Sequence, residues 1–281
     1  MKIIRSIIEM QKLSNQYKLK GKIGFVPTMG CLHEGHLSLV RQSKKETDFT
    51  VVSIFVNPAQ FGPNEDFKQY PRNISRDINM LKPFCIDALF YPYAKQMYPE
   101  GFSTYIQVEG SLECFEGSIR PGHFKGVATV VIKFFNILKA DVAYFGQKDR
   151  QQCSVIKRMV KDLNIDIKIK ILPTVREKDG LAISSRNAYL TPEEHQKALC
   201  LYDALNISKK MVEQGVKDCM FIESAMKKRI LREKGVKLQY ANIIDRDSFD
   251  VLSKIEKRAI AIVAVRIGRT RLIDNIALCD R

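Results

Sequence analysis

Two histidines and two glycines lie within residues 29–36, and their types and spacing suit the binding of phosphate. The segment reads MGCLHEGH, which places His33 and His36 three residues apart. Imidazoles can donate hydrogen bonds to phosphate oxygens, and Gly30 and Gly35 let the backbone approach a ligand where a Cβ would block it. The pattern predicts a phosphate or nucleotide site.

A strand before this segment and a helix after it would position the histidines. Residues 23–26 are apolar and partly β-branched, which predicts a short buried strand that ends at Pro27, because proline cannot donate to a ladder. Leu37, Leu39 and Val40 then begin an amphipathic helix. The N-terminus of such a helix offers unpaired N–H groups and a partial positive charge, so it favours an anion.

Two other interpretations of the histidines stay open. His-x-x-His is half of a zinc site, but HEGH lacks the four-residue spacing of HExxH and the cysteines form no tetrahedral set. Both histidines could also be ordinary surface or capping residues. The glycine between them favours the phosphate interpretation over this one.

The composition is that of a soluble globular protein. The chain has 281 residues, 45% hydrophobic and 27% charged, which allows one large or two modest domains. No run approaches the ~20 apolar residues of a membrane span, and charges interrupt the apolar N-terminal stretch, which excludes a clean signal peptide. The seven cysteines include no CxxC and predict free thiols in a reducing compartment, so we expect a cytoplasmic protein.

The net charge of +15 could indicate a nucleic-acid partner, because basic surfaces attract phosphate backbones. The lysines are scattered, however, tryptophan is absent and no basic run is interleaved with aromatic residues. We interpret the charge as solvated faces plus a cleft that attracts anions. We expect neither a nucleic-acid nor a membrane partner.

Strands that alternate with helices predict the fold of the first part of the chain. Further strands are expected at residues 50–56, 88–91, 105–108, 142–145 and 167–172. Helices are expected at residues 6–17, 37–45, 74–81 and 154–163, and from the turn at residues 120–123 to about residue 138. This alternation predicts an α/β fold with a Rossmann-like, doubly wound parallel sheet.

Three polar clusters follow predicted strands. Asn57, Gln60 and Tyr70 lie in a long loop after residues 50–56, and such sheets bind ligands at the carboxyl ends of their strands. A connector rich in turn residues is the alternative. The other two clusters are GQKDRQQ, with Lys148 and Asp149, and the SSR of residues 184–186, which suit phosphate and ribose or else form a surface turn and an interdomain linker.

The last third of the chain predicts a second, smaller domain. Thr191 as N-cap, Pro192 and Glu194 form a capping box that starts a helix running to about residue 214. A helix at residues 219–233 and antiparallel strands at residues 238–244, 259–267 and 271–278 should follow. We expect a first domain at residues 1–175 and a C-terminal α+β lid domain at residues 176–281.

Five motifs resemble, in order, those of the pantothenate synthetase (pantoate–β-alanine ligase) family within the HxGH nucleotidyltransferases. They are PTMGCLHEGH, FVNPAQFGPNEDFKQYPR, EGSIRPGHFKGVATVV, GQKDRQQ and GLAISSRNAYL, and they cover nearly the whole chain. The resemblance implies a Rossmann-like domain that binds ATP and pantoate, and a smaller domain that closes over the nucleotide. We expect a homodimer.

The resemblance also assigns roles by motif. His36 would be the catalytic acid, Gln60 and Gln152 would hold pantoate, and Gln60 would also face β-alanine. The residues implied to contact ATP are Met29, Gly30, Cys31, Leu32, His33, Glu34, Gly35, His36, Gly146, Gln147, Lys148, Asp149, Val175, Ile183, Ser184, Ser185 and Arg186. No protein metal site is implied, and Mg²⁺ would enter with ATP.

The implied reaction joins pantoate to β-alanine through a pantoyl adenylate and releases pyrophosphate and then AMP. Ile183, Gln147 and Cys31 depart from the usual methionine, glutamate and small residue of the family motifs, although Ile183 keeps an apolar wall. Two alternatives stay open. One is an HxGH enzyme that transfers a nucleotidyl group to a phosphate acceptor, and the other is a basic RNA-binding module.

Overall fold

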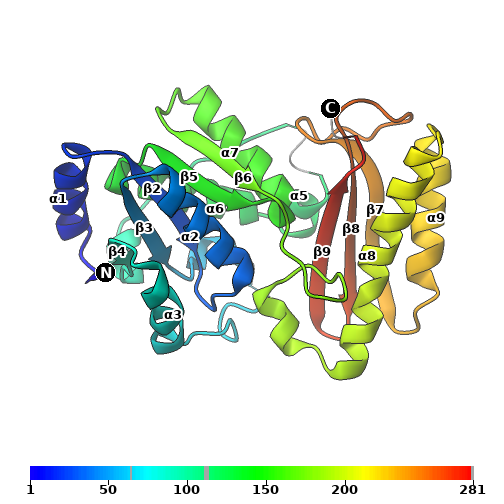
Figure 1. Ribbon diagram of the computed structural model, residues 1–281, viewed down its shortest axis with the longest axis horizontal. Coiled ribbons are helices and arrows are strands. Elements are labelled where there is room, and N and C mark those ends of the chain that lie inside the picture. The colour runs from blue at the N-terminus through cyan, green and yellow to red at the C-terminus, as the bar shows by residue number, and fades with distance from the viewer. Residues whose placement is uncertain (64, 111–113, 280–281) are drawn as a thin grey trace. The chain divides into compact units, whose positions relative to one another are not determined.

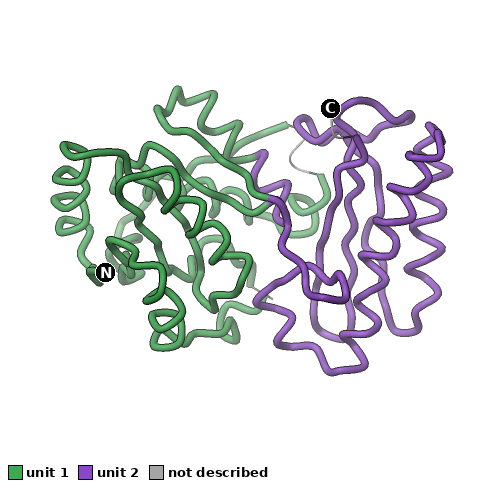
Figure 2. The backbone as a smooth tube through the Cα atoms, viewed as in Figure 1, with its two compact units in different colours: residues 1–146, 155–172 green, residues 147–154, 173–281 purple. Residues whose placement is uncertain are grey.

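The computed structural model describes residues 1–63, 65–110 and 114–279, which form two compact units. Unit 1 comprises Met1–Gly146 and Val155–Leu172, and unit 2 comprises Gln147–Ser154 and Pro173–Arg281 (Figure 2). Neither unit is a single continuous stretch of chain. The domain boundary expected after residue 175 stays a prediction.

Unit 1 is built on a six-stranded parallel sheet (Figure 1). The strands are β1 (Lys2–Ile4), β2 (Ile23–Thr28), β3 (Phe49–Ile54), β4 (Ala88–Phe90), β5 (Val142–Gly146) and β6 (Lys168–Leu172). Their order is β1-β4-β3-β2-β5-β6, so the winding direction reverses at β2. The predicted doubly wound sheet is therefore confirmed. Ligands of such sheets bind beyond the carboxyl ends of the strands near the reversal.

Helices cover both faces of this sheet, because the strands are apolar on both sides. The helices in this part of the chain are α1 (Ile7–Lys18), α2 (Glu34–Glu46), α3 (Ile74–Leu81), α4 (Ala94–Met97), α5 (Glu116–Ile119), α6 (His123–Leu138) and α7 (Arg150–Asp162), and residues 150–154 of α7 belong to unit 2. On one face Val26 of β2 packs in a buried cluster with Leu37 and Val40 of α2. On the other, Phe25 of β2 packs against Phe134 of α6, with ring centroids 5.5 Å apart.

Two strand predictions for unit 1 need correction. The segment at residues 105–108 is irregular rather than a strand, because the Ile106 N–H is bonded to Thr129 Oγ1 of α6 at 3.0 Å instead of to a neighbouring strand. Strand β2 continues through Pro27 instead of ending there. Its pairing with β5 stops at Phe25, so the missing N–H of proline interrupts no ladder on that side.

Unit 2 contains the predicted antiparallel sheet with two helices packed on it. Its strands are β7 (Val236–Asp245), β8 (Ala259–Ile267) and β9 (Thr270–Ala277), and its helices are α8 (Pro192–Glu213) and α9 (Cys219–Leu231). Helix α8 starts with the predicted capping box, in which Thr191 Oγ1 accepts from Glu194 N at 3.2 Å and Glu194 Oε2 accepts from Thr191 N at 3.0 Å. Over the residues that the structure describes, we find no helix long and apolar enough to cross a bilayer.

Candidate active site

The histidine turn, residues 29–36, connects β2 to α2 and is held by a buried carboxylate. Asp77 of α3 is 1% exposed, and its two oxygens accept from the N–H groups of Cys31 and Leu32, both at 2.8 Å. Gly30 and Cys31 have φ angles of 84° and 50°, a left-handed conformation that costs energy for a non-glycine residue. The carboxylate bonds offset this strain and fix the course of the backbone. Nothing in the sequence pattern indicated Asp77.

The turn brings His33 and His36 together at the start of α2. Their rings are stacked with centroids 4.0 Å apart, and the carbonyl of His33 accepts from the N–H of His36 at 2.9 Å. His33 is the N-cap residue, but its side chain makes no capping bond. A Cβ added to Gly35 would lie 3.0 Å from the His33 ring, which explains the glycine between the histidines. The pair therefore sits at a helix N-terminus, where an anion is favoured.

The zinc interpretation of these histidines gains no support. Across residues 1–63, 65–110 and 114–279, one trio of carboxylate and imidazole groups lies close enough to share a metal ion: Glu177, Asp179 and His195. Neither histidine of the turn belongs to it. His195 Nε2 and Asp179 Oδ2 are 2.8 Å apart, and this side-chain hydrogen bond lowers the pKa of Asp179.

Gln60 follows β3 and reaches the histidine turn. It ends the short helix η1 (Pro58–Gln60), is 7% exposed, and places its amide nitrogen 3.0 Å from the sulfur of Met29. A Cβ on Gly126 of α6 would overlap the carbonyl oxygen of Ala59, so the backbones of α6 and η1 are in direct contact. Gln60 after β3 and Met29 after β2 are thus in contact at the carboxyl ends of these two adjacent strands.

A buried histidine supports η1 from the start of α6. His123 Nδ1 lies 2.8 Å from the carbonyl oxygen of Gln60, and its Nε2 lies 3.0 Å from Arg120 Nη1. Arginine can only donate, so Nε2 accepts and Nδ1 carries the proton that is donated to Gln60. Arg120 is itself paired with both oxygens of Glu65, at 2.6 and 2.7 Å. The sequence indicated only a turn here.

Burial, helped by the nearby Arg120 charge, lowers the pKa of His123 to about 4 from its ordinary value of 6.5. An unfolded chain would bind a proton here between pH 6.5 and 4, whereas the folded protein would not, so acidification through this window should cost up to about 3 kcal/mol. A His123→Gln variant, which can still donate to Gln60 and accept from Arg120, should lose less stability on acidification.

Urea unfolding followed by circular dichroism would measure this, since the chain contains no tryptophan. We expect the stability difference between parent and variant to change between pH 6.5 and 5 and to stay constant between pH 7 and 8. Parallel curves throughout would show that His123 takes up its proton over the same pH range in the folded and the unfolded protein, so that burial does not lower its pKa.

In unit 2, the predicted Gln147–Lys148–Asp149 cluster forms the short helix η4 (Gln147–Asp149) at the start of α7. Asn275 of β9 is 3% exposed, and its amide nitrogen donates to the carbonyl oxygens of Gln147 and Lys148 at 3.0 and 2.9 Å. The Lys148 ammonium lies 3.7 Å from Asp149. Strand β9 therefore fixes the backbone of this turn. Gly146 ends β5 in unit 1, and Gln152 lies partly buried on α7.

Strand β9 also anchors the chain just before the second predicted cluster of unit 2, residues 184–186. Asp274 accepts from Arg176 through both oxygens, at 2.6 and 3.0 Å, and the guanidinium of Arg176 lies 4.5 Å from the centre of the Tyr202 ring. Burial raises the pKa of Asp274 in spite of this partner. The backbone of Arg176 forms an isolated antiparallel β-bridge with Ala182, the residue before the predicted ATP contact Ile183.

Val175 and the segment at residues 183–186 lie side by side. The Ile183 N–H donates to the carbonyl of Val175 at 3.0 Å. Ser184 then caps the short helix η5 (Ser185–Tyr189), its hydroxyl accepting from the N–H of Arg186 at 3.3 Å. The structure thus brings these predicted residues together within unit 2, and their role toward ATP stays a prediction.

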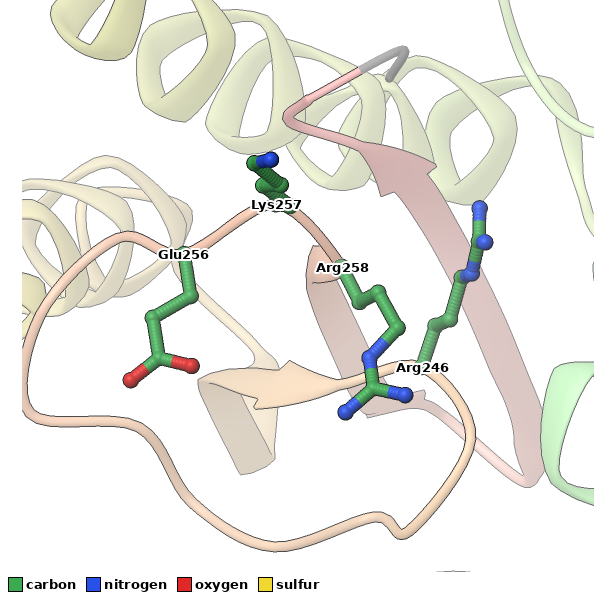
Figure 3. Close-up of a pocket in the computed structure, with 4 residues that line it drawn as sticks. All are labelled: Arg246, Glu256, Lys257 and Arg258. Carbon is green, nitrogen blue, oxygen red and sulfur yellow. The ribbon is translucent and has the colours of Figure 1, made fainter.

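A shallow pocket of unit 2 contains none of the predicted site residues. It is lined by Arg246, Glu256, Lys257 and Arg258 (Figure 3). Arg258 extends from the start of β8 and pairs with the buried Asp245 at 2.9 Å. This internal pairing occupies the arginine, so we do not assign the pocket to a phosphate ligand.

The parallel sheet and the histidine turn together define a doubly wound α/β protein whose candidate site lies at the carboxyl ends of β2 and β3. Comparison with known proteins specifies it further. The chain belongs to the pantoate–β-alanine ligase family, whose profile matches residues 2–277, and it is an enzyme.

The relatives cover the chain from end to end. It is 53% identical to a pantothenate synthetase of Caldicellulosiruptor bescii and 51% identical to one of Thermotoga petrophila, over 99% of this chain and 99% and 100% of theirs. A crystal structure of the Thermus thermophilus enzyme superposes with a TM-score of 0.96 at 43% identity, covering 99% of this chain and 100% of that one. The Francisella tularensis enzyme, described as complexed with β-γ ATP and β-alanine, gives a TM-score of 0.83 at 37% identity and covers 99% and 98%.

Proposed function

We propose that this enzyme condenses pantoate with β-alanine to form pantothenate, using ATP through a pantoyl-adenylate intermediate. Membership of the family supports the overall condensation. The observation that carries the ATP-dependent step is the histidine turn, in which two stacked imidazoles at a helix N-terminus sit on a backbone fixed by Asp77. Such a terminus favours a negatively charged group.

In the first step, a carboxylate oxygen of pantoate attacks the α-phosphorus of ATP while the bond from that phosphorus to the pyrophosphate oxygen breaks. His36 acts as the acid toward the departing pyrophosphate, and His33 donates beside it. Lys148, Ser184 and Arg186 supply further charge and donors to the triphosphate. Donors fixed before the reaction stabilise developing charge without reorganising, which is how they lower a barrier.

In the second step, the amine of β-alanine attacks the acyl carbon of the adenylate, and AMP leaves with its bonding electron pair. The amine loses its proton as the amide of pantothenate forms. Gln60 and Gln152 hold pantoate, and Gln60 also faces β-alanine. Neutral amides orient a carboxylate by hydrogen bonds without a full charge partner, so the oxygen stays nucleophilic. The reaction needs no protein nucleophile.

We propose that Mg²⁺ enters with ATP. The carboxylate beside the histidine turn, Asp77, already uses both oxygens on backbone N–H groups, so it is not positioned to ligate an ion. The donor set therefore fits a metal held mainly by phosphate oxygens and water, the usual arrangement for Mg²⁺. When bound, Mg²⁺ would neutralise charge on the triphosphate. A cytoplasmic homodimer remains our expectation for the assembled enzyme.

The test of the proposed function is the exchange of labelled pyrophosphate into ATP. We expect exchange that requires both Mg²⁺ and pantoate and that proceeds without β-alanine, whereas release of AMP should require β-alanine. Exchange at the same rate with and without pantoate would overturn the assignment of the adenylated substrate. Withholding Mg²⁺ with a chelator provides the control for the metal.

A further inference from the structure

We propose that Tyr98 is a positioning residue for the pantoate site, acting through Asn57 to fix the direction of the Gln60 carboxamide. The inference rests on the proposed function, because it assumes that Gln60 contacts pantoate. Nothing in the sequence pattern pointed to Tyr98. Its role follows from a chain of hydrogen bonds within unit 1, in which each donor and acceptor can be assigned.

The amide of Asn57 can take only one orientation. Its Oδ1 lies 3.2 Å from the N–H of Ala59, a group that can only donate, so this atom must be the oxygen. Its Nδ2 lies 3.1 Å from the carbonyl oxygen of Gly126, which can only accept. Asn57 is 1% exposed, so its amide depends on partners within the protein and not on bulk water.

Tyr98 completes the environment of Asn57. Its hydroxyl donates to Asn57 Oδ1 at 2.8 Å, a shorter bond than the one from Ala59. The Tyr98 ring packs edge-on against Phe102, with centroids 5.1 Å apart, and lies 6.4 Å from Phe55 just after β3. Burial raises the pKa of Tyr98, which keeps the hydroxyl protonated and able to donate.

The orientation of Asn57 determines that of Gln60. The second hydrogen of Asn57 Nδ2 is donated to Gln60 Oε1 at 3.1 Å, so the Gln60 oxygen is turned toward Asn57. The Gln60 nitrogen is then turned toward Met29, whose sulfur lies 3.0 Å away. A thioether is a weak acceptor, so the Gln60 amide N–H groups can donate instead to a stronger acceptor when a ligand binds. Gln60 thereby presents donors, which match a carboxylate or hydroxyl oxygen of a hydroxy acid.

The variant that tests this is Tyr98→Phe, which removes the hydroxyl and keeps the ring contacts. Loss of one neutral hydrogen bond corresponds to a change of about fivefold. We therefore expect the KM for pantoate to rise about fivefold, with the KM for ATP, kcat and the thermal unfolding midpoint nearly unchanged. Tyr93→Phe, at a tyrosine that is 53% exposed, is the matched control and should change none of these.

A double-mutant cycle with Asn57→Ala separates positioning from general packing. If Tyr98 acts through Asn57, Tyr98→Phe should have little further effect on the KM for pantoate in the Asn57→Ala background. Additive effects of the two substitutions, equal rises in the KM for both substrates, or an unchanged KM for pantoate in Tyr98→Phe would each overturn the proposal. Failure of the proposed function would be detected separately: the parent enzyme would exchange labelled pyrophosphate into ATP at the same rate with and without pantoate.

Discussion

Replacing His36 with alanine should slow formation of the acyl adenylate by roughly 10²–10³, the usual cost of removing one preorganised donor from a developing charge. His36 lies at the start of α2 with its ring stacked on His33, which restricts where it can point. We propose that His36 donates to the β- and γ-phosphates of ATP. These groups are present while pyrophosphate leaves and are absent when β-alanine attacks the adenylate, so the second half-reaction should be nearly unaffected.

Rapid-quench measurements of the two half-reactions would test this, the second one started from preformed pantoyl adenylate and β-alanine. His195→Ala is the matched control, because it removes a histidine that pairs with Asp179 instead of joining the histidine turn. It should leave both rates close to those of the parent. An equal fall in both half-reactions of His36→Ala would mean that His36 holds the adenylate or shapes the pocket, and its role as the acid would be wrong.

Changing Asp77 to asparagine should also lower the activity of the enzyme, by about tenfold less than the loss of His36, although Asp77 is not expected to touch a substrate. The amide keeps the shape of the carboxylate but turns one acceptor into a donor that faces the N–H of Cys31 or Leu32. Losing a charge-assisted bond to a buried donor costs about 1.5–3 kcal/mol. If that energy holds the turn in its binding conformation, kcat/KM for ATP should fall by roughly 10-fold to 100-fold.

The measurement is steady-state kinetics with ATP varied at saturating pantoate and β-alanine, together with thermal unfolding. Asp162→Asn is the control, since Asp162 pairs with Arg158 on the surface of α7 and its side chain is 47% exposed. An Asp77→Asn variant with an unchanged kcat/KM for ATP would show that the bonds to Cys31 and Leu32 do not set the geometry of the site.

The sequence predicted those parts of the fold that depend on short-range patterns. Helix α3 and strand β8 have the predicted bounds, and the capping box of α8 is present, because periodicity and capping are local properties. Strand β1 was missed because it has three residues, two of them exposed, which is too short for a pattern. The incorrect strand at residues 105–108 was apolar enough to pair, but a threonine hydroxyl of α6 takes the N–H of Ile106.

The candidate site also contains residues that local patterns predict and residues that they do not. The residues with recognisable chemistry, such as His33, His36 and Gln60, could be named from motifs. The groups that hold them could not, because Asp77 lies 45 and 46 residues from its partners and Asn275 lies 127 and 128 residues from its own. A carboxylate on an ordinary helix carries no local sign that its oxygens meet a distant turn. Predicting such supports requires the tertiary contacts themselves.

The discontinuous course of the chain through the two units affects how the protein can fold during synthesis. The chain leaves unit 1 after Gly146 and returns to it at Val155, and strand β6 pairs with β5 through Lys168–Leu172. Ribosomes add roughly 5–20 residues per second, so β6 is synthesised about 1–5 s after β5, and that edge of β5 is unpaired during this interval. Until then its apolar side chains and unpaired backbone leave that edge open to pairing with another chain. Slower translation between β5 and β6 would therefore lengthen exposure to aggregation rather than help unit 1 to fold.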